Sequence, residues 1–349
     1  WKKLGLYLLA VAVALTLGGL VLLALDVDPM AYYSRMFTMG MVGNKIAYKT
    51  FENYLKVFVP LALTSVALSL AFKMRFWNIG GEGQVLIGGL VAALIMVYFG
   101  SSLPAPLLFA AMALGSIAAG ALWGFIPAWF KSRWNTNETL FTLMMNYIAT
   151  QLTAFFIIIW EVPKGAGKIG IINQGTEAGW LPVVGGQKYL LVILVVAVLT
   201  VFMYIYLNYS KHGYEIAVVG ESQRTASYAG IKVDRVIIRT MVLSGAICGL
   251  MGYILTAGIS HTLTTTIVDS RGFTAVMVSW MSKFNPFIMI AASLLLVTMD
   301  RGAGEISTAF SLNQSFADIL TGIILFFIIA TEFFITYKVT LRKSSKKEA

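Results

Sequence analysis

The chain has 349 residues, of which 58% are hydrophobic and only 12% are charged, whereas an average soluble domain has roughly 25% charged residues. This composition leaves no room for a soluble catalytic domain and predicts one integral membrane domain over residues 1–349, with about ten spans of roughly 20 residues each. We attribute the formal net charge of +10 to membrane topology and contact with anionic membrane lipid, and not to nucleic-acid binding.

Apolar runs of spanning length predict an all-α, polytopic membrane protein. Eight runs lie at residues 4–25, 55–72, 85–99, 105–125, 139–160, 189–207, 236–257 and 319–335. The first run is too long for a signal peptide and predicts a retained helix. Residues 272–281 and 287–299 are shorter, and Pro286 separates them. They predict two broken or half-length helices, which brings the total to ten.

Basic residues predict the orientation of these spans. Lys2, Lys73, Lys131 and Lys211 fall in alternate connections, and further lysines and arginines fill the C-terminal tail after residue 337. Because positive charge concentrates on the cytoplasmic side, we expect both termini to be cytoplasmic. Counting residues 272–299 as a single span would place the basic tail outside, so the charge pattern also favours ten crossings.

Residues 78–84 bring three glycines together with Asn78, Glu82 and Gln84 between two apolar runs. Glycines permit bends, whereas the polar groups need partners in hydrocarbon. Non-helical backbone near a bilayer is tolerated where it is buried in protein or lines a water-filled cavity. The segment therefore predicts a hinge or gate near a translocation path. For Glu82, a place at the start of the third span and a place facing a cavity both remain open.

The position of this segment suggests an internal repeat. Residues 78–84 are expected at the inner end of the second span, and a similar polar turn at residues 269–274 is expected on the outside. Opposite orientation of the two copies predicts inverted repeats of five helices each.

The fifth span begins with a second polar set. Asn137 or Thr136 is expected to cap the helix, with Glu138 favourably placed in its first turn. Asn146 lies two turns deeper and must face protein or water, so an interhelical hydrogen bond and a role in the pore are both open. Small-residue faces at Gly120 and Gly124, and at Gly245 and Gly249, predict close helix packing.

The longest predicted cytoplasmic loop covers residues 210–235. Ser222 is expected to cap a short helix over residues 224–229, which ends at Gly230 in a left-handed conformation. Such a helix, with exposed Tyr228, suits docking into a groove of another protein, and a solvated connector is the alternative.

The sequence contains no energy-coupling or catalytic motif. Residues 163–169 look superficially like a phosphate loop, but Ile169 replaces the serine or threonine that would hold magnesium. His212 and His261 are expected on opposite sides of the membrane, which disfavours an intramembrane enzyme. The single cysteine, Cys248, cannot form an intrachain disulfide.

Three sets of residues together resemble a known family. They are residues 76–84 (Phe-Trp-Asn-Ile-Gly-Gly-Glu-Gly-Gln), residues 137–148 with Asn-Glu-Thr-Leu and Met-Asn-Tyr-Ile, and Gly220 with Ala226 and residues 228–231. The chain resembles the permease subunits of ABC importers in the branched-chain amino acid, ribose and nucleoside permease family. It is most similar to the nucleoside branch served by basic membrane lipoproteins. The external loop predicted over residues 28–56 finds no counterpart in that pattern.

The resemblance implies a type II ABC importer fold in a bacterial cell (inner) membrane, with no enzymatic activity in this chain. It implies a second related permease subunit, a cytoplasmic ABC ATPase and an extracytoplasmic substrate-binding lipoprotein as partners. ATP and magnesium would bind to the ATPase, and no cofactor to this chain. The loop 210–235 would be the coupling helix that meets the ATPase, through Gly220, Glu221, Arg224, Tyr228 and Gly230.

The expected function is import of nucleosides by alternating access. A few polar side chains suffice for a weak transport site, and we expect Asn78, Glu82, Gln84 and Asn146 near the path or its gate. A permease for a sugar or a branched-chain amino acid in the same family is the alternative, followed by an ion-driven secondary carrier.

Overall fold

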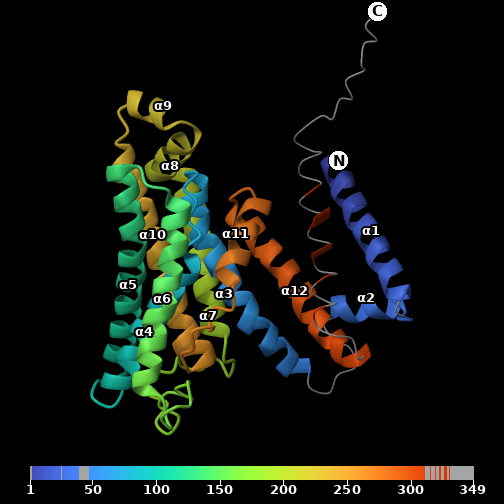
Figure 1. The fold of residues 1–349 in the computed structure, drawn as a ribbon, viewed down its shortest axis with the longest axis horizontal. Helices are drawn as coiled ribbons and strands as arrows, with labels where there is room; N and C mark the ends of the chain where they lie inside the picture. Colours follow the sequence, from blue (N-terminus) through green and yellow to red (C-terminus); the bar gives the residue numbers. More distant parts are fainter. Residues whose placement is uncertain are drawn as a thin grey trace, which may run out of the picture. The chain divides into compact units, whose positions relative to one another are not determined.

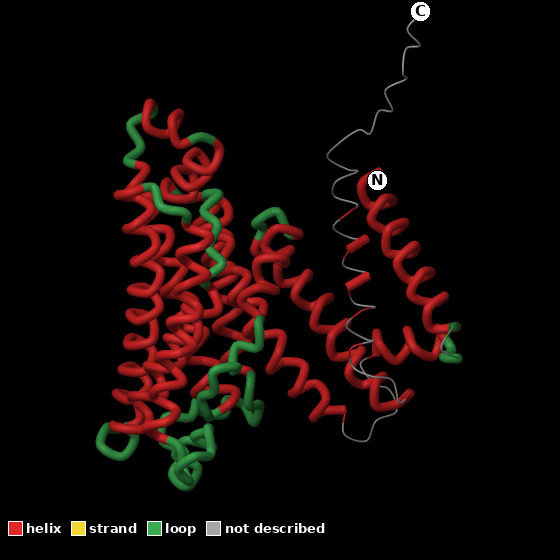
Figure 2. The backbone as a smooth tube through the Cα atoms, in the orientation of Figure 1, coloured by secondary structure: helices red, strands yellow, loops and turns green. Residues whose placement is uncertain are grey.

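The computed structural model describes residues 2–24, 26–38 and 47–310, together with residues 315, 319, 322–323, 326–327 and 330. The chain forms two compact units, one from Leu55–Leu294 and the other from Trp1–Tyr54 with Leu295–Ala349. Figures 1 and 2 show helices joined by turns and loops, and the described residues contain no strand apart from an isolated bridge between Val184 and Gln187. The predicted all-α class is confirmed.

The helix bounds follow the predicted spans closely in the larger unit. In chain order the helices are α1 (Lys2–Leu23), α2 (Pro29–Thr38), α3 (Ala47–Lys73), α4 (Gly81–Phe99), α5 (Ala105–Trp134), α6 (Glu138–Trp160), α7 (Leu190–Tyr209), α8 (Lys211–Glu221), α9 (Gln223–Tyr228), α10 (Val233–Tyr253) with its π-helical continuation η1 (Ile254–Ser260), α11 (Arg271–Met281) and α12 (Pro286–Phe310).

Six of the described helices are long and apolar enough to cross a membrane, namely α3, α4, α5, α6, α7 and α10 with η1. A multi-pass membrane protein is therefore confirmed, and the count of ten spans stays a prediction. The predicted span at residues 319–335 and the basic tail lie largely outside the described residues.

Two predicted boundaries are wrong. The break at Pro286 is present, but α12 continues to Phe310 and is not half-length. Asp300 and Arg301 follow the predicted apolar run directly, and their side chains are 52% and 44% exposed, so these charges do not end the helix. The connection predicted over residues 28–56 is also partly helical, because it contains α2 and the first turns of α3.

Glycines permit a very close helix contact in the larger unit, between α5 and α10. A Cβ atom on Gly120 would lie 2.2 Å from the carbonyl oxygen of Gly245, and one on Gly249 would lie 2.1 Å from that of Ser116. Only glycine permits this approach of the two backbones. The close packing predicted from these small residues is confirmed, and it aligns α10 against both α5 and α4.

Candidate functional site

The linker between α3 and α4 is held by a pair of buried amides. Asn78 and Gln84 are 0% and 1% exposed, and each amide nitrogen lies 3.4 Å from the oxygen of the other side chain. The Asn78 Oδ1 atom also accepts a hydrogen bond from the backbone N–H of Gly80 at 3.0 Å. These bonds satisfy polar groups that would otherwise be costly within an apolar bundle.

Asn146 joins this linker to α6. Its Oδ1 atom accepts from the N–H of Gly83 at 2.8 Å, and its Nδ2 atom donates to the carbonyl of Ile79 at 3.0 Å. The Thr142 hydroxyl accepts from the N–H of Ile79 at 3.2 Å. A Cβ atom on Gly83 would lie 2.8 Å from Asn146 Oδ1, so glycine is needed for the contact. The interhelical hydrogen bond proposed for Asn146 is confirmed, and its role in transport stays a prediction.

Glu82 connects the same site to α11. Its carboxylate accepts from the backbone N–H of Ser270 at 3.0 Å and from that of Gly272 at 2.7 Å. Glu82 thus lies in the first turn of α4 and also binds the free N–H groups at the start of α11. Both helix ends carry partial positive charge, which stabilises a carboxylate. The predicted place of Glu82 in the first turn of the third span is confirmed, but no side chain caps α4 by a hydrogen bond, and the helix that Glu82 caps is α11. Cavity lining stays a prediction.

The predicted placement of residues 269–274 on the outside, across the membrane from residues 78–84, is wrong. Glu82 binds the backbone N–H groups of Ser270 and Gly272, so the two segments meet. They meet inside the bundle, because Asn146, which binds Gly83, lies about 12 Å along α6 from its start, at 1.5 Å per residue. Backbone and side-chain polar groups satisfy one another at this meeting point, which is why irregular backbone is tolerated within the bundle.

The two segments nevertheless reach this point from opposite ends of the bundle. α3 ends beside α8, where a Cβ atom on Gly220 would lie 2.2 Å from the carbonyl oxygen of Lys73. α10 begins at the same end, because Arg239 forms an ion pair with Glu215 of α8 at 2.9 Å. The chain then turns back at His261, at the far end of α10. The inverted five-helix repeat stays a prediction.

The helices α8 and α9 form the end of the bundle seen at the top of Figure 1. The Ser222 hydroxyl accepts from the N–H of Thr225 at 3.2 Å, and Gly230 has a φ of 79°. The predicted cap, short helix and left-handed end are confirmed. Tyr228 is 93% exposed, and Glu221 and Arg224 are exposed beside it. Gly220 instead packs against α3.

The loop that follows α6, at the end of the bundle opposite α8 and α9, binds the side chain of Glu161. Glu161 accepts from the N–H of Gly165 at 2.8 Å and from that of Gly167 at 2.7 Å. These two bonds lower the pKa of Glu161 below its ordinary value. The loop over residues 163–169 superficially resembles a phosphate loop, but the N–H groups of Gly165 and Gly167 already bind a carboxylate.

His261 stacks on Trp180 with ring centroids 4.0 Å apart and lies far from His212. The described residues contain no cluster suited to a metal.

Three features of the site are not predicted from the sequence. One is the bond of Thr142 to the linker, and another is the stacking of Trp77 on Trp280 of α11, with ring centroids 5.1 Å apart. An aromatic pair this distant in the sequence leaves no local pattern. The contact of Glu82 with Gly272 was missed for the same reason.

Comparison with known proteins identifies a family of transport permeases. Residues 50–329 match the family model described as the permease component of the branched-chain amino acid transport system. The chain is 29% identical to a glucose ABC transporter permease of Haloferax volcanii, over 97% of this chain and 90% of the relative. It is 29% identical to the guanosine permease NupP of Bacillus subtilis, over 92% and 91% of the two chains.

The nucleoside permease NupB of Lactococcus lactis is 26% identical over 99% of this chain and 95% of its own length. NupQ, a further guanosine permease of Bacillus subtilis, also matches. No solved structure matches the chain.

Proposed function

The chain belongs to the family of permease components of branched-chain amino acid transport systems, and from this premise we propose that it forms a translocation path for nucleosides. As an ABC permease subunit it is a transport component and not an enzyme. The family implies an ATPase and a substrate-binding protein as partners, and the related pair NupP and NupQ supports a second permease subunit.

Similarity to two nucleoside-transporting relatives over nearly the whole chain carries the choice of substrate. A sugar is the second candidate, because the glucose permease of Haloferax volcanii covers the chain equally well. The substrate-binding protein is expected to be an extracytoplasmic lipoprotein, and the membrane to be a bacterial inner membrane with both termini of this chain cytoplasmic.

The meeting point of α4 and α11 is the proposed gate. Asn78, Gln84 and Asn146 are satisfied internally, whereas Glu82 alone bonds across to α11. A movement of α11 away from α4 would free the Glu82 carboxylate and two backbone N–H groups. These groups would then face a cavity, where they can hydrogen-bond a polar substrate. Alternating access would consist of making and breaking this contact.

The contact of α8 with α3 provides a route from the ATPase to that gate. The exposed Glu221, Arg224 and Tyr228 would contact the ATPase, which holds ATP and magnesium. Displacement of α8 would act on α3 through the backbone contact of Gly220 with Lys73. α3 leads directly into residues 78–84, so a small shift at the membrane surface would reach the α4 end of the gate.

The substrate is tested by uptake into proteoliposomes that contain this chain with its partner permease, ATPase and binding protein. We expect ATP-dependent uptake of labelled guanosine that excess unlabelled adenosine inhibits and excess glucose does not. Uptake of glucose without uptake of nucleosides would favour the sugar alternative. Uptake of either without any ATPase subunit would favour an ion-driven carrier.

The proposed contact of α8 and α9 with the ATPase is tested by Glu221→Ala combined with Arg224→Ala in the same proteoliposomes. We expect loss of substrate-stimulated ATP hydrolysis and of uptake, with the subunit still inserted and folded. Lys168→Ala, in the loop at the opposite end, removes an exposed charge and serves as the control. Unchanged ATPase stimulation and uptake in the double variant would contradict the assignment.

A further inference from the structure

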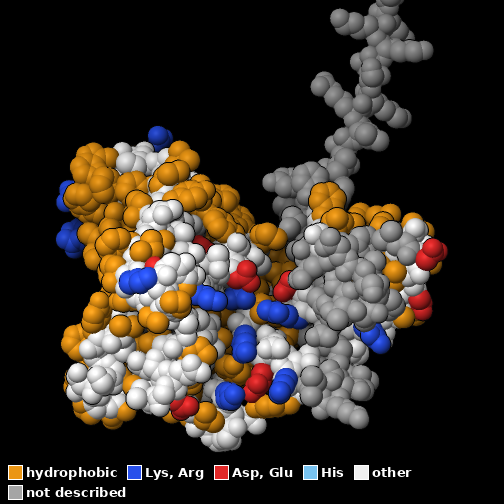
Figure 3. Space-filling view, turned by 60° about the horizontal axis from the view of Figure 1, so that its bottom comes forward, with side chains coloured by type: hydrophobic (Ala, Val, Ile, Leu, Met, Phe, Trp, Pro, Cys, Tyr) orange, Lys and Arg blue, Asp and Glu red, His pale blue; other side chains and the backbone are white. Residues whose placement is uncertain are grey.

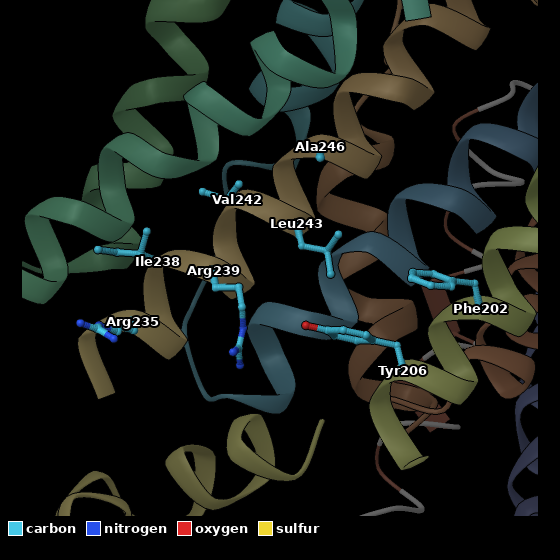
Figure 4. A pocket seen from close by; sticks show the side chains of 8 residues that line it. All are labelled: Phe202, Tyr206, Arg235, Ile238, Arg239, Val242, Leu243 and Ala246. Carbon is cyan, nitrogen blue, oxygen red and sulfur yellow. The ribbon is translucent and has the colours of Figure 1, made fainter. Parts of the chain in front are cut away.

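We propose that a groove between α7 and α10 binds an anionic phospholipid, with the phosphate held by Arg235 and Arg239 and an acyl chain along the groove. The groove has a volume of 650 Å³ and lies close to the α8 end of the bundle. Figure 4 shows its lining side chains, which come from these two helices only. Its apolar lining consists of Phe202, Ile238, Val242, Leu243 and Ala246.

Helical spacing separates the two chemical parts of the groove. Arg235 and Arg239 lie one turn apart near the start of α10, whereas Ala246 lies about 10 Å further along the same helix, at 1.5 Å per residue. On α7, Phe202 and Tyr206 are also one turn apart, and their rings stack with centroids 6.0 Å apart. The charged groups therefore lie toward the α8 end of the groove and the apolar ones further along the helices, which matches the order of headgroup and acyl chain in a phospholipid.

Both arginines keep part of their charged groups accessible. Arg239 forms an ion pair with Glu215 through one terminal nitrogen, and its side chain is 33% exposed. Arg235 is exposed on the same helix face. Figure 4 shows the Tyr206 hydroxyl and the Arg239 side chain directed toward each other from the two helices. Guanidinium groups bind phosphate through paired hydrogen bonds.

Charge decides which occupant fits. Arg235 and Arg239 outnumber Glu215, and Lys73 lies close by with its Nζ atom on the carbonyl of Leu207 at 3.1 Å. An apolar helix of another subunit would bury the exposed Arg235 guanidinium without a partner, at a cost. A free phosphate would gain nothing from the apolar part of the groove. A phospholipid with a net negative headgroup satisfies both parts.

The test is native mass spectrometry of the purified full-length protein and of the assembled importer, with added phosphatidylglycerol or phosphatidylcholine. A basic residue near the membrane surface contributes about 1 kcal/mol to binding anionic lipid, or about fivefold in affinity. We expect phosphatidylglycerol to bind at least fivefold more tightly than phosphatidylcholine, and glycerol phosphate not to compete.

Two variants address the two parts of the groove. Arg235→Gln should weaken phosphatidylglycerol binding about fivefold and leave phosphatidylcholine unchanged. Ala246→Phe should fill the groove and weaken binding of both lipids. Arg133→Gln is the matched control, because it removes an exposed arginine from the same end of the bundle but outside the groove.

Equal affinity for the two lipids, or the same loss in Arg235→Gln and Arg133→Gln, would overturn the proposal. Absence of bound phosphatidylglycerol from the assembled importer would also overturn it, because a partner subunit would then cover the groove. The measurement needs neither substrate nor ATP, so its result is independent of the transported compound.

Discussion

At the scale of single residues, the polar groups inside the bundle have dense and specific hydrogen bonds. Asn146 contacts two backbone groups of the linker, and Glu82 contacts two of α11. Their chemical types could be predicted from the sequence, because an amide or carboxylate within an apolar run needs partners. Their partners could not, since Gly272 is remote from Glu82 along the chain.

Removal of the Asn146 amide should destabilise the protein. Asn146→Ala leaves the N–H of Gly83 and the carbonyl of Ile79 buried without these partners, at about 1–3 kcal/mol for each unsatisfied group. We expect a clearly lower melting temperature in detergent, measured by tryptophan fluorescence. Asn208→Ala removes an exposed amide that bonds only within α7, and its melting temperature should stay close to the wild-type value. Equal melting temperatures for the two variants would contradict the role of Asn146.

Low pH should weaken the hydrogen bonds that hold the loop after α6. Hydrogen bonds from Gly165 and Gly167 lower the pKa of Glu161 below 4.5. A lowered pKa in the folded state stabilises the loop fully above the unfolded value, and that contribution is lost as the pH falls from 4.5 through the folded pKa. Hydrogen exchange of residues 165–167 should accelerate in this range.

Glu161→Gln serves as the comparison for this titration. It removes the titrating group, so exchange in the loop should be faster than wild type at neutral pH and lose its additional acceleration below pH 4.5. A wild-type loop whose exchange follows only the intrinsic pH dependence would argue against the proposed cap.

At the scale of helices, backbone contact between α5 and α10 determines the packing. The glycines that permit it could be identified from their spacing of four residues, which places them on one helix face. Which helix each face contacts depends on the fold, because the same spacing occurs on both α5 and α10 and is compatible with several pairings.

Gly120→Ala should disrupt this packing even though alanine favours helix by about 1 kcal/mol relative to glycine. The new methyl group would meet the backbone of Gly245 and Gly249, which cannot rotate away. Overpacking typically costs about 1–3 kcal/mol or more, and we expect a lower melting temperature or a poorly folded subunit.

Gly115→Ala is the matched control on the same helix. Its methyl group would meet only the side-chain ends of Ile95 and Val91, which can adjust, so the melting temperature should be close to that of the wild type. Similar behaviour of the two alanine variants in thermal unfolding would show that the α5–α10 contact is looser than described.

At the scale of the whole molecule, the orientation in the membrane can be measured with cysteine labelling. The natural Cys248 is fully buried, so it gives little background with a membrane-impermeant maleimide. In intact cells we expect Lys168→Cys to be labelled from outside. Tyr228→Cys should be labelled only after the membrane is permeabilised, because α9 is predicted to be cytoplasmic.

Wild-type protein provides the background in this experiment, and labelling under denaturing conditions shows that each introduced cysteine is present. Labelling of Tyr228→Cys from outside would reverse the predicted orientation. It would also exclude contact of α9 with a cytoplasmic ATPase, since the two would lie on opposite sides of the membrane.

The sequence by itself determined the membrane class, most helix positions, the cap at Ser222 and the family resemblance, whereas the structure selected Asn137 over Thr136 as the cap of α6. These properties follow from local composition and spacing, which hydrophobicity and backbone hydrogen bonding translate directly into helices. Only the tertiary structure decided that residues 78–84 and 269–274 meet inside the bundle, and that α7 and α10 leave a groove with arginines at one end. Such contacts join residues far apart in the chain, and their partners are selected by the packing of whole helices and not by any local pattern.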